Sequence, residues 1–321
     1  MTQVATGLTN LTKWRIATAS AIGHAHLLPF SIRDRAVRLL ASPEFCPGTL
    51  FTVDFFGQRY SGQLDSFIDW SVFMFGAYEE AVSKLMVKVV REGFSAPPVV
   101  WDIGANCGHH TLLLAPYAKE VHAFEPFASL CDSIQQKIQE NNLRNVKIHR
   151  LGLGDKVTTR PFEAPADRNL GSGVFYPDGK LPPDHVVTID LPLSTGDALV
   201  AAGTSPPQFL KMDVQEFEYQ ALVGMHDTIL TSQPIIVLEY GRLLQERTSG
   251  MRRTRELLGI DYSWYLIKLA VGGFKLKALE DISRFSSRPF TFVDIIGIPR
   301  ERAERLNKVL SVSSNGTSNE S

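Results

Sequence analysis

WDIGANCGHHT, residues 101–111, is the stretch that decides the fold. It follows two valines, so a short apolar run ends at once in an acid, two glycines, an asparagine and two histidines. Gly104 and Gly108 allow the backbone to turn sharply and to come close to a ligand. A helix that begins behind them directs its positive N-terminal end toward that ligand. The stretch therefore predicts a ligand-binding turn between a buried strand and a helix.

Outward from this turn, apolar runs alternate with segments of helical periodicity. The expected strands cover residues 99–104, 121–126, 146–155, 207–214 and 234–240, with last strands at 264–270 and 290–298, and the expected helices include 127–142 and 216–229. Strands that are separated by helices indicate a parallel sheet covered on both faces. The fold class that we predict is therefore α/β with a doubly wound, mostly parallel sheet.

The remaining segments divide the chain into three expected parts. Residues 1–95 form a helical and hairpin extension, residues 96–300 form the ligand-binding domain, and residues 301–321 form a helix end and a disordered tail. Within the extension we expect a hairpin at 49–64 and one helix at 70–93. The Pro- and Gly-rich segment 163–185 is either a connection or a substrate lid that carries Asn169, Gly171, Ser172 and Tyr176.

Composition excludes several classes of protein. The net charge of the 321 residues is −1, so no broad field attracts nucleic acid or an anionic membrane. No apolar run is long enough to cross a bilayer. Three cysteines without zinc or disulfide spacing favour a reducing, cytoplasmic location. The first 33 residues contain no acid, which is typical of an organellar transit segment, but an amphipathic helix is the simpler interpretation.

An acid ends each of five consecutive expected strands. These acids are Asp102, Glu125, Asp155, Asp213 and Glu239. In open α/β sheets, ligands bind beyond the carboxyl ends of the strands. Any one of these acids is equally well explained as a helix cap, but that explanation is weaker for all five together. We therefore expect them to surround a ligand.

The turn also indicates which ligand. A dinucleotide-binding loop has the pattern Gly-x-Gly-x-x-Gly, whereas this loop lacks the second glycine and an acid precedes its first one. A carboxylate at this point repels phosphate and attracts an ammonium group. Glu125, at the end of the next strand, is placed to accept hydrogen bonds from ribose hydroxyls. An adenosine with an amino-acid tail and no phosphates is S-adenosylmethionine.

Four segments also resemble the FkbM-type methyltransferases, a group of class I S-adenosylmethionine-dependent enzymes. These segments are WDIGANCGHHTLLLA, AFEP, LKMDVQEFEYQALVGM and, upstream, FIDWSVFMFGAYEEA, and the resemblance spans roughly residues 60–245. The family's fourth block usually reads Lys-x-Asp-x-Glu-Gly-x-Glu, so Gln215 replaces an acid and Glu216 replaces a glycine.

The resemblance implies a Rossmann-like, seven-stranded class I methyltransferase fold. It implies that the cofactor is held by Asp102, Gly104, Asn106, Gly108 and Glu125, with Asp155 near the adenine and Asp213 near the reactive methyl group. It also implies an acceptor, because members of the family methylate hydroxyl groups on sugars and secondary metabolites. The partner that we expect is thus a small-molecule or glycan hydroxyl acceptor and not a nucleic acid.

A hydroxyl acceptor has to lose its proton during methyl transfer. The candidates for this catalytic role are Asp213, His110 and Glu239, with His109 and His226 as weaker ones. Lys211 lies two residues before Asp213 and is expected to pair with it, which would lower the basicity of the acid. The spacing of the acids matches no closed set of metal ligands, so the sequence leaves a metal undecided.

Two other functions stay open at this point. A nicotinamide-dependent oxidoreductase would use a similar fold, although the missing glycine pattern weighs against it. A non-catalytic binding module would be expected to have a degraded loop, whereas residues 102–108 are intact. The aromatic residues of the extension form core, an acceptor pocket or a homodimer surface, with core the first expectation; they are Phe51, Phe55, Phe56, Tyr60, Trp70, Phe73, Phe75 and Tyr78.

Overall fold

A computed structural model describes residues 3–4, 9–165, 186–241, 244, 256–270, 273–278 and 293–310. The candidate lid residues Asn169, Gly171, Ser172 and Tyr176 lie outside the described residues, as does the tail at 311–321. The two expectations for these segments therefore stay predictions.

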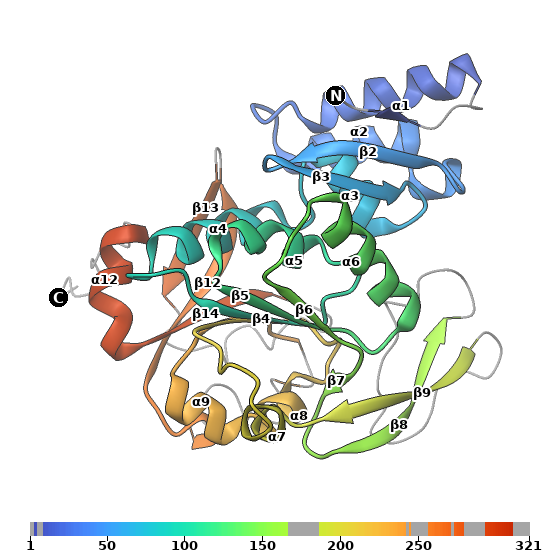
Figure 1. Cartoon of the computed structure of the whole chain (residues 1–321). Coiled ribbons are helices and arrows are strands. Elements are labelled where there is room, and N and C mark those ends of the chain that lie inside the picture. Colours follow the sequence, from blue (N-terminus) through green and yellow to red (C-terminus); the bar gives the residue numbers. More distant parts are fainter. Residues whose placement is uncertain are drawn as a thin grey trace.

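One large sheet forms the centre of the molecule (Figure 1). Its strands lie in the order β13 (Gly273–Ala278), β12 (Tyr262–Ala270), β14 (Asp294–Pro299), β11 (Ile235–Glu239), β10 (Phe209–Met212), β4 (Val99–Ile103), β5 (Glu120–Phe124) and β6 (Val146–His149). The five strands from β11 to β6 are parallel, and β14 is antiparallel to both of its neighbours. The predicted doubly wound, mostly parallel sheet is confirmed. It has one strand more than the expected seven because β13 forms a hairpin with the edge strand β12.

Helices cover both faces of the sheet. The helices α4 (Glu80–Glu92), α5 (His109–Leu114) and α6 (Ala128–Glu140) lie on one face, and α7 (Gly196–Ala201), α8 (Glu218–Val223) and α9 (His226–Ser232) lie on the other (Figure 1). Alternate residues of β4 enter two different cores, since successive side chains of a strand point to opposite faces. Val100 packs in the cluster beneath α4 and α5, whereas Trp101 and Ile103 pack in the cluster that contains α8 residues.

The order of the strands places a ligand site beside β4. Its two neighbours are β5, which follows it in the chain, and β10, which arrives much later. The connections after β4 and β10 therefore leave the sheet in different directions. In doubly wound sheets this switch point opens a crevice at the carboxyl ends of the strands. Ile103 and Met212, the last residues of the two strands, pair with each other at this edge.

The N-terminal extension consists of helices and the predicted hairpin. Its helices α1 (Asn10–Gly23) and α2 (Phe30–Ala41) and the short turn η1 (Pro43–Phe45) precede the hairpin of β2 (Leu50–Phe55) and β3 (Gln58–Gln63), to which β1 (Gln3–Val4) adds a strand. The single helix expected at 70–93 is in fact two helices, α3 (Phe67–Phe75) and α4. They are interrupted because Gly76 and Glu79 have left-handed φ values of 87° and 50°. No helix in the part of the chain that the structure describes is long and apolar enough to cross a membrane.

The extension packs closely on the rest of the molecule. Asn141, just after α6, accepts a hydrogen bond from the Arg59 backbone N–H at 2.8 Å and donates one to the Arg59 carbonyl at 2.7 Å. One hydrophobic cluster contains Trp70 of the extension, Val121 of β5 and Leu306 of α12 (Arg300–Leu310). This core crosses both boundaries of the division expected from the sequence, which stays a prediction.

Two expected elements are divided in the structure. The strand predicted at 146–155 is β6 followed by β7 (Gly152–Leu153), and β7 belongs to a separate sheet with β8 (Thr158–Pro165) and β9 (Val186–Ser194). The helix predicted at 216–229 is α8 and α9, which are separated at Gly224. A Cβ atom on Gly224 would lie 1.9 Å from the Gly154 carbonyl oxygen, so the two loops approach each other too closely for any side chain.

Two histidines lie at the β5–β6 edge of the sheet. Nδ1 of His122 is 2.9 Å from Nε2 of His149, and the His149 ring stacks on Phe124 with centroids 4.5 Å apart. Burial, with the neighbouring His122, lowers the pKa of His149 from 6.5 to about 4. The folded protein thus holds His149 neutral at pH values where the unfolded chain protonates it.

The low pKa of His149 predicts a loss of stability in acid. Below pH 6.5 the unfolded chain binds more protons than the folded one, so stability is lost as the pH falls from 6.5 to about 4. Substitution of His149 by Gln should reduce this loss by about 1 kcal/mol, after allowance for partial exposure. Urea unfolding at pH 7.5, 6 and 4.5 measures the effect. Parallel pH profiles for the wild type and the variant would contradict it.

Candidate active site

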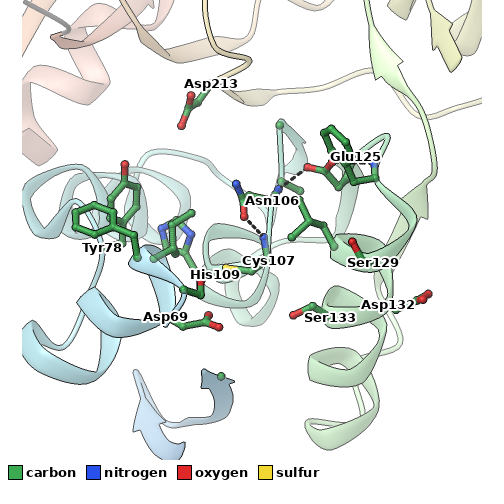
Figure 2. A pocket seen from close by; sticks show the side chains of 18 of the residues that line it. Asp69, Tyr78, Asn106, Cys107, His109, Glu125, Ser129, Asp132, Ser133 and Asp213 are labelled. Atoms are coloured by element: carbon green, nitrogen blue, oxygen red, sulfur yellow. Dashed lines mark hydrogen bonds between the residues drawn. The ribbon is translucent and has the colours of Figure 1, made fainter. Parts of the chain in front are cut away.

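A cavity of about 1100 Å³ opens at the carboxyl ends of β4, β5 and β10. Residues 103–107 and Glu125 contribute to its wall beside the sheet, and Asp213 reaches it from the end of β10 (Figure 2). The extension closes another side with residues of β2, β3 and α3, and α6 contributes Ser129, Asp132 and Ser133. The turn that decides the fold therefore lines this cavity, and its expected role in binding a ligand stays a prediction.

Gly104 lets the first loop fit between the strand ends. Its φ is 77°, and a Cβ atom there would lie 1.8 Å from the Asp213 carbonyl oxygen. The N–H groups of Gly104 and Ala105 both donate to the Phe124 carbonyl at 3.0 Å, which fixes the loop on β5. Gly108 has a φ of 83° and precedes α5, and a Cβ there would lie 2.8 Å from Ile134 of α6. Gly104 lines the cavity, whereas Gly108 serves helix packing behind it.

Glu125 is held by the backbone on the far side of the cavity from Asp213 (Figure 2). One carboxylate oxygen accepts the Asn106 N–H at 2.8 Å and the other accepts the Phe127 N–H at 3.0 Å. Burial raises the pKa of Glu125 to about 7, although both of these hydrogen bonds favour the charged form. Asn106 has a φ of 52°, and its side-chain oxygen accepts the Cys107 N–H at 2.7 Å. The two residues thus form one rigid unit of the cavity wall.

Asp102 lies beneath the loop and is not among the residues that line the cavity. It accepts a hydrogen bond from the Thr111 hydroxyl at 2.6 Å, and its other oxygen is 3.9 Å from the Lys211 ammonium. Burial raises the pKa of Asp102, and the charge of Lys211 opposes this shift. The direct contact with a ligand that we expected of Asp102 stays a prediction. Its position indicates instead that it orients Lys211 and the first turn of α5.

Asp213 reaches the cavity from the end of β10. Its carboxylate lies 3.5 Å from the Lys211 ammonium and accepts a hydrogen bond from the Gln215 amide at 3.0 Å. The expected pairing with Lys211 is therefore present. Gln215 and Glu216 both have left-handed φ values, 53° and 70°. Glu216 thus adopts the conformation that suits the glycine of the resembled motif.

The histidines occupy three different environments. His109 lines the cavity, and its ring lies 5.3 Å from that of Tyr78 (Figure 2). His110 is buried outside the cavity lining, with Nε2 3.4 Å from the Ser83 hydroxyl and 4.0 Å from Glu79. Burial lowers the pKa of both rings, so both are neutral at physiological pH. His226 is exposed and contacts Asp227. Its place gives no support to a catalytic role, and that of His110 gives none either.

Glu239, the last of the catalytic candidates, belongs to a cluster of acids beside the cavity. One carboxylate oxygen from each of Asp213, Glu218 and Glu239 lies within 4.8 Å of the others. Burial and the charge of Asp213 raise the pKa of Glu239 to about 9, and burial raises that of Glu218 to about 8. Asp294, the register partner of Glu239, contributes to the same repulsion.

The sequence interpretation missed Glu79 and Asp294, and the structure places Asp155 away from the cavity lining. Asp294 is the first residue of β14, which runs antiparallel to β11. The N-terminal end of β14 therefore lies beside the C-terminal end of β11, and a search of strand C-terminal ends does not find it. Glu79 follows Tyr78 in the motif GAYE, which was the available signal. Asp155 is exposed and outside the cavity lining because β7 leaves the central sheet. The role expected for Asp155 near an adenine stays a prediction without support from its position.

The chemistry of the cavity follows from these groups. Glu125 offers a carboxylate to hydroxyl donors at one end, whereas Asp213 offers a proton acceptor at the other. The acids make the β10–β11 end favourable for cations and unfavourable for phosphates. Such a cavity suits a ligand with hydroxyls at one end and a positive charge at the other.

Comparison with known proteins agrees with this chemistry. The family model "Methyltransferase FkbM domain" matches residues 102–263. The chain is 28% identical over 156 residues to "Hexuronic acid methyltransferase AglP" of Haloferax volcanii, which covers 47% of this chain and 60% of that protein. The chain therefore spans about three fifths of the curated relative that it matches.

Two solved structures are also similar. Methyltransferase FkbM from Methylobacillus flagellatus is 14% identical, with a TM-score of 0.41, over 89% of this chain and 58% of that one. M. jannaschii TYW2 in complex with AdoMet is 15% identical, with a TM-score of 0.36, over 77% of this chain and 85% of that one.

The family model extends from Asp102 to the start of β12. It therefore includes the segments AFEP and LKMDVQEFEYQALVGM. The matched range includes Glu125 and Asp213, which line the cavity, and Glu239, which lies in the cluster of acids beside it. The resemblance found in the sequence is thereby confirmed. The chain belongs to the FkbM methyltransferase family.

Proposed function

We propose that the protein uses S-adenosylmethionine to methylate a hydroxyl group of a sugar-like acceptor. The observation that carries the proposal is the placement of Glu125 and Asp213 at opposite ends of one cavity, with the Gly104 loop between them. Glu125 would accept the ribose hydroxyls, and the loop would follow the amino-acid tail. Asp213 would accept the proton of the acceptor hydroxyl while the methyl group is transferred.

The residues present fit this cofactor. The loop has no phosphate-binding glycine pattern, and Gly104 leaves no space for a Cβ atom where the chain passes the end of β10. Phe124, Phe127 and Leu153 provide apolar surface beside Glu125 for a flat base. S-adenosylmethionine itself supplies the activated methyl group, so the protein has to align two molecules and to exclude water.

The extension gives the acceptor its polar wall. Arg59, Ser61 and Gln63 of β3 line the cavity and offer hydrogen bonds of the kind that hydroxyls and carboxylates use. The relative from Haloferax volcanii is named a hexuronic acid methyltransferase, which supports an acceptor with both kinds of group. We therefore propose a hexuronic acid or a related sugar as the acceptor.

A direct assay tests the proposal. The purified chain is incubated with methyl-labelled S-adenosylmethionine and with glucuronic, galacturonic and neutral sugar glycosides, and methyl ethers are detected by mass spectrometry. We expect a methyl ether on a uronic acid glycoside. Binding of S-adenosylhomocysteine without transfer to any hydroxyl would support a non-catalytic module instead. Binding of NAD alone would support the oxidoreductase alternative.

Substitution of Glu125 by Gln tests the cofactor end of the cavity. The amide of Gln cannot accept from both the Asn106 and Phe127 N–H groups, and it loses the charge that binds ribose hydroxyls. We expect the Kd of S-adenosylhomocysteine to rise about 10- to 100-fold, the equivalent of one hydrogen bond to a charged group. Titration calorimetry measures it. Asp155→Asn is the matched control, since this exposed acid lies outside the cavity lining and should leave the Kd unchanged.

A further inference from the structure

The acids at the ends of β10 and β11 are more numerous than the proposed methyl transfer requires. Asp213, Glu218 and Glu239 bring their carboxylate oxygens within 4.8 Å of one another, from the end of a strand, the start of α8 and the end of the next strand. Glu79 and Asp294 add two further carboxyl groups, and both interact electrostatically with Asp213 and Glu239. The arrangement therefore concentrates carboxyl groups in one half-buried place.

The positive charge beside the cluster does not balance it. Among the residues that the structure describes, Lys211 is the cation that contacts the cluster, 3.5 Å from Asp213. Its ammonium is shared with Asp102 at 3.9 Å and donates a hydrogen bond to the Gly104 carbonyl at 3.4 Å. Lys211 is thus shared between Asp213 and the buried Asp102, and neither Glu218 nor Glu239 forms an ion pair within the described residues. Buried charges of one sign are stable only when they are neutralised by protons or by a bound cation.

Glu218 gives the second, independent indication. Its side chain is only 1% exposed. One carboxylate oxygen accepts the Val214 N–H at 3.0 Å, whereas the other, Oε2, is buried and has no hydrogen-bond partner among the described residues. A helix cap alone would explain the first oxygen and not the burial of the second. A buried acceptor without a partner costs free energy that a ligand at this point would recover.

We infer that Asp213, Glu218 and Glu239 bind one divalent cation of the Mg²⁺ and Mn²⁺ class. Three carboxylates and no sulfur or imidazole ligand form the hard oxygen set that these cations prefer. Solvent or the acceptor would complete the coordination from the cavity, because Asp213 lies on its wall. A cation there would hold the oxygens of a sugar acceptor beside Asp213. This role rests on the proposed function, whereas the binding of the cation does not.

Titration with Mn²⁺ tests the site without any turnover. The full chain is treated with a chelator, dialysed and titrated with Mn²⁺, and free Mn²⁺ is followed by electron paramagnetic resonance. We expect one bound ion per chain that excess Mg²⁺ displaces. Glu239→Gln should weaken this binding by at least about tenfold. Asp132→Asn is the matched control, because Asp132 lines the same cavity but on α6, away from Asp213 (Figure 2).

The possible results separate the two proposals. Thermal unfolding first shows that each variant is folded, and Asp213→Asn replaces Glu239→Gln as the ligand variant if the latter is not. No Mn²⁺ binding by the wild type, or equal binding by the ligand variant and Asp132→Asn, would overturn the cation site. Binding of S-adenosylhomocysteine is titrated on the same samples without metal. If the wild type binds Mn²⁺ but does not bind S-adenosylhomocysteine, only the proposed methyl transfer is overturned.

Discussion

Substitution of Gly104 by Ala should unfold the cofactor loop and abolish binding of S-adenosylhomocysteine. The new Cβ atom would lie 1.8 Å from the Asp213 carbonyl oxygen and 2.9 Å from its carbon. Both are backbone atoms that cannot rotate away, so the ends of β4 and β10 have to separate. Overpacking of this kind costs about 1–3 kcal/mol, and the left-handed φ adds about 1 kcal/mol. We expect a loss of about 2–4 kcal/mol in the free energy of unfolding, measured by urea denaturation.

Gly57→Ala is the matched control for Gly104→Ala. Gly57 has nearly the same φ, 81° against 77°, but nothing lies within 4 Å of the Cβ that it would gain. It should therefore show the cost of the backbone conformation alone, about 1 kcal/mol, with cofactor binding retained. Equal losses of stability in the two variants would show that the close approach of β4 and β10 is not what Gly104 provides.

The cavity wall at the ends of β4 and β5 could be predicted from the sequence because its signals are local. Gly104, Asn106 and Glu125 follow directly from strands whose apolar runs are unambiguous, and the parallel order of β4 and β5 brings them together. Asp213 follows in the same way from β10. A strand end fixes the position of a residue only if the strand stays in the sheet. That condition fails at Asp155, where β7 pairs with β9 instead.

The acidic cluster could not be predicted because it depends on contacts between distant segments. Asp294 joins it through the antiparallel pairing of β14 with β11, and a period of two does not reveal the direction of a strand. Glu79 joins it because the chain turns at a left-handed residue between α3 and α4, where helical periodicity suggested a continuous helix. The motif GAYE was the local signal for Glu79, whereas the chain around Asp294 carries no local sign of a ligand.

Asp213→Asn should leave a folded protein that binds the cofactor but turns over far more slowly than the wild type. The amide keeps the size of the side chain, and Lys211 retains Asp102 as a charged neighbour 3.9 Å away. An amide cannot accept the proton of the acceptor hydroxyl, and general bases contribute about 10²–10⁴-fold to rates. We expect kcat to fall by a factor in this range, while the Kd of S-adenosylhomocysteine changes less than about tenfold.

The same variant distinguishes a base from a cation ligand. If Asp213 acts only by binding the cation, a large excess of Mn²⁺ should refill the weakened site and restore the rate of Asp213→Asn. If it accepts the proton, the rate stays low at every Mn²⁺ concentration, whereas Glu239→Gln recovers. Turnover of Asp213→Asn equal to that of the wild type would exclude both roles. Asp213 lies on the cavity wall, 3.5 Å from Lys211 and beside Glu218 and Glu239. Both the proposed methyl transfer and the proposed cation site depend on this residue, so its substitution distinguishes them.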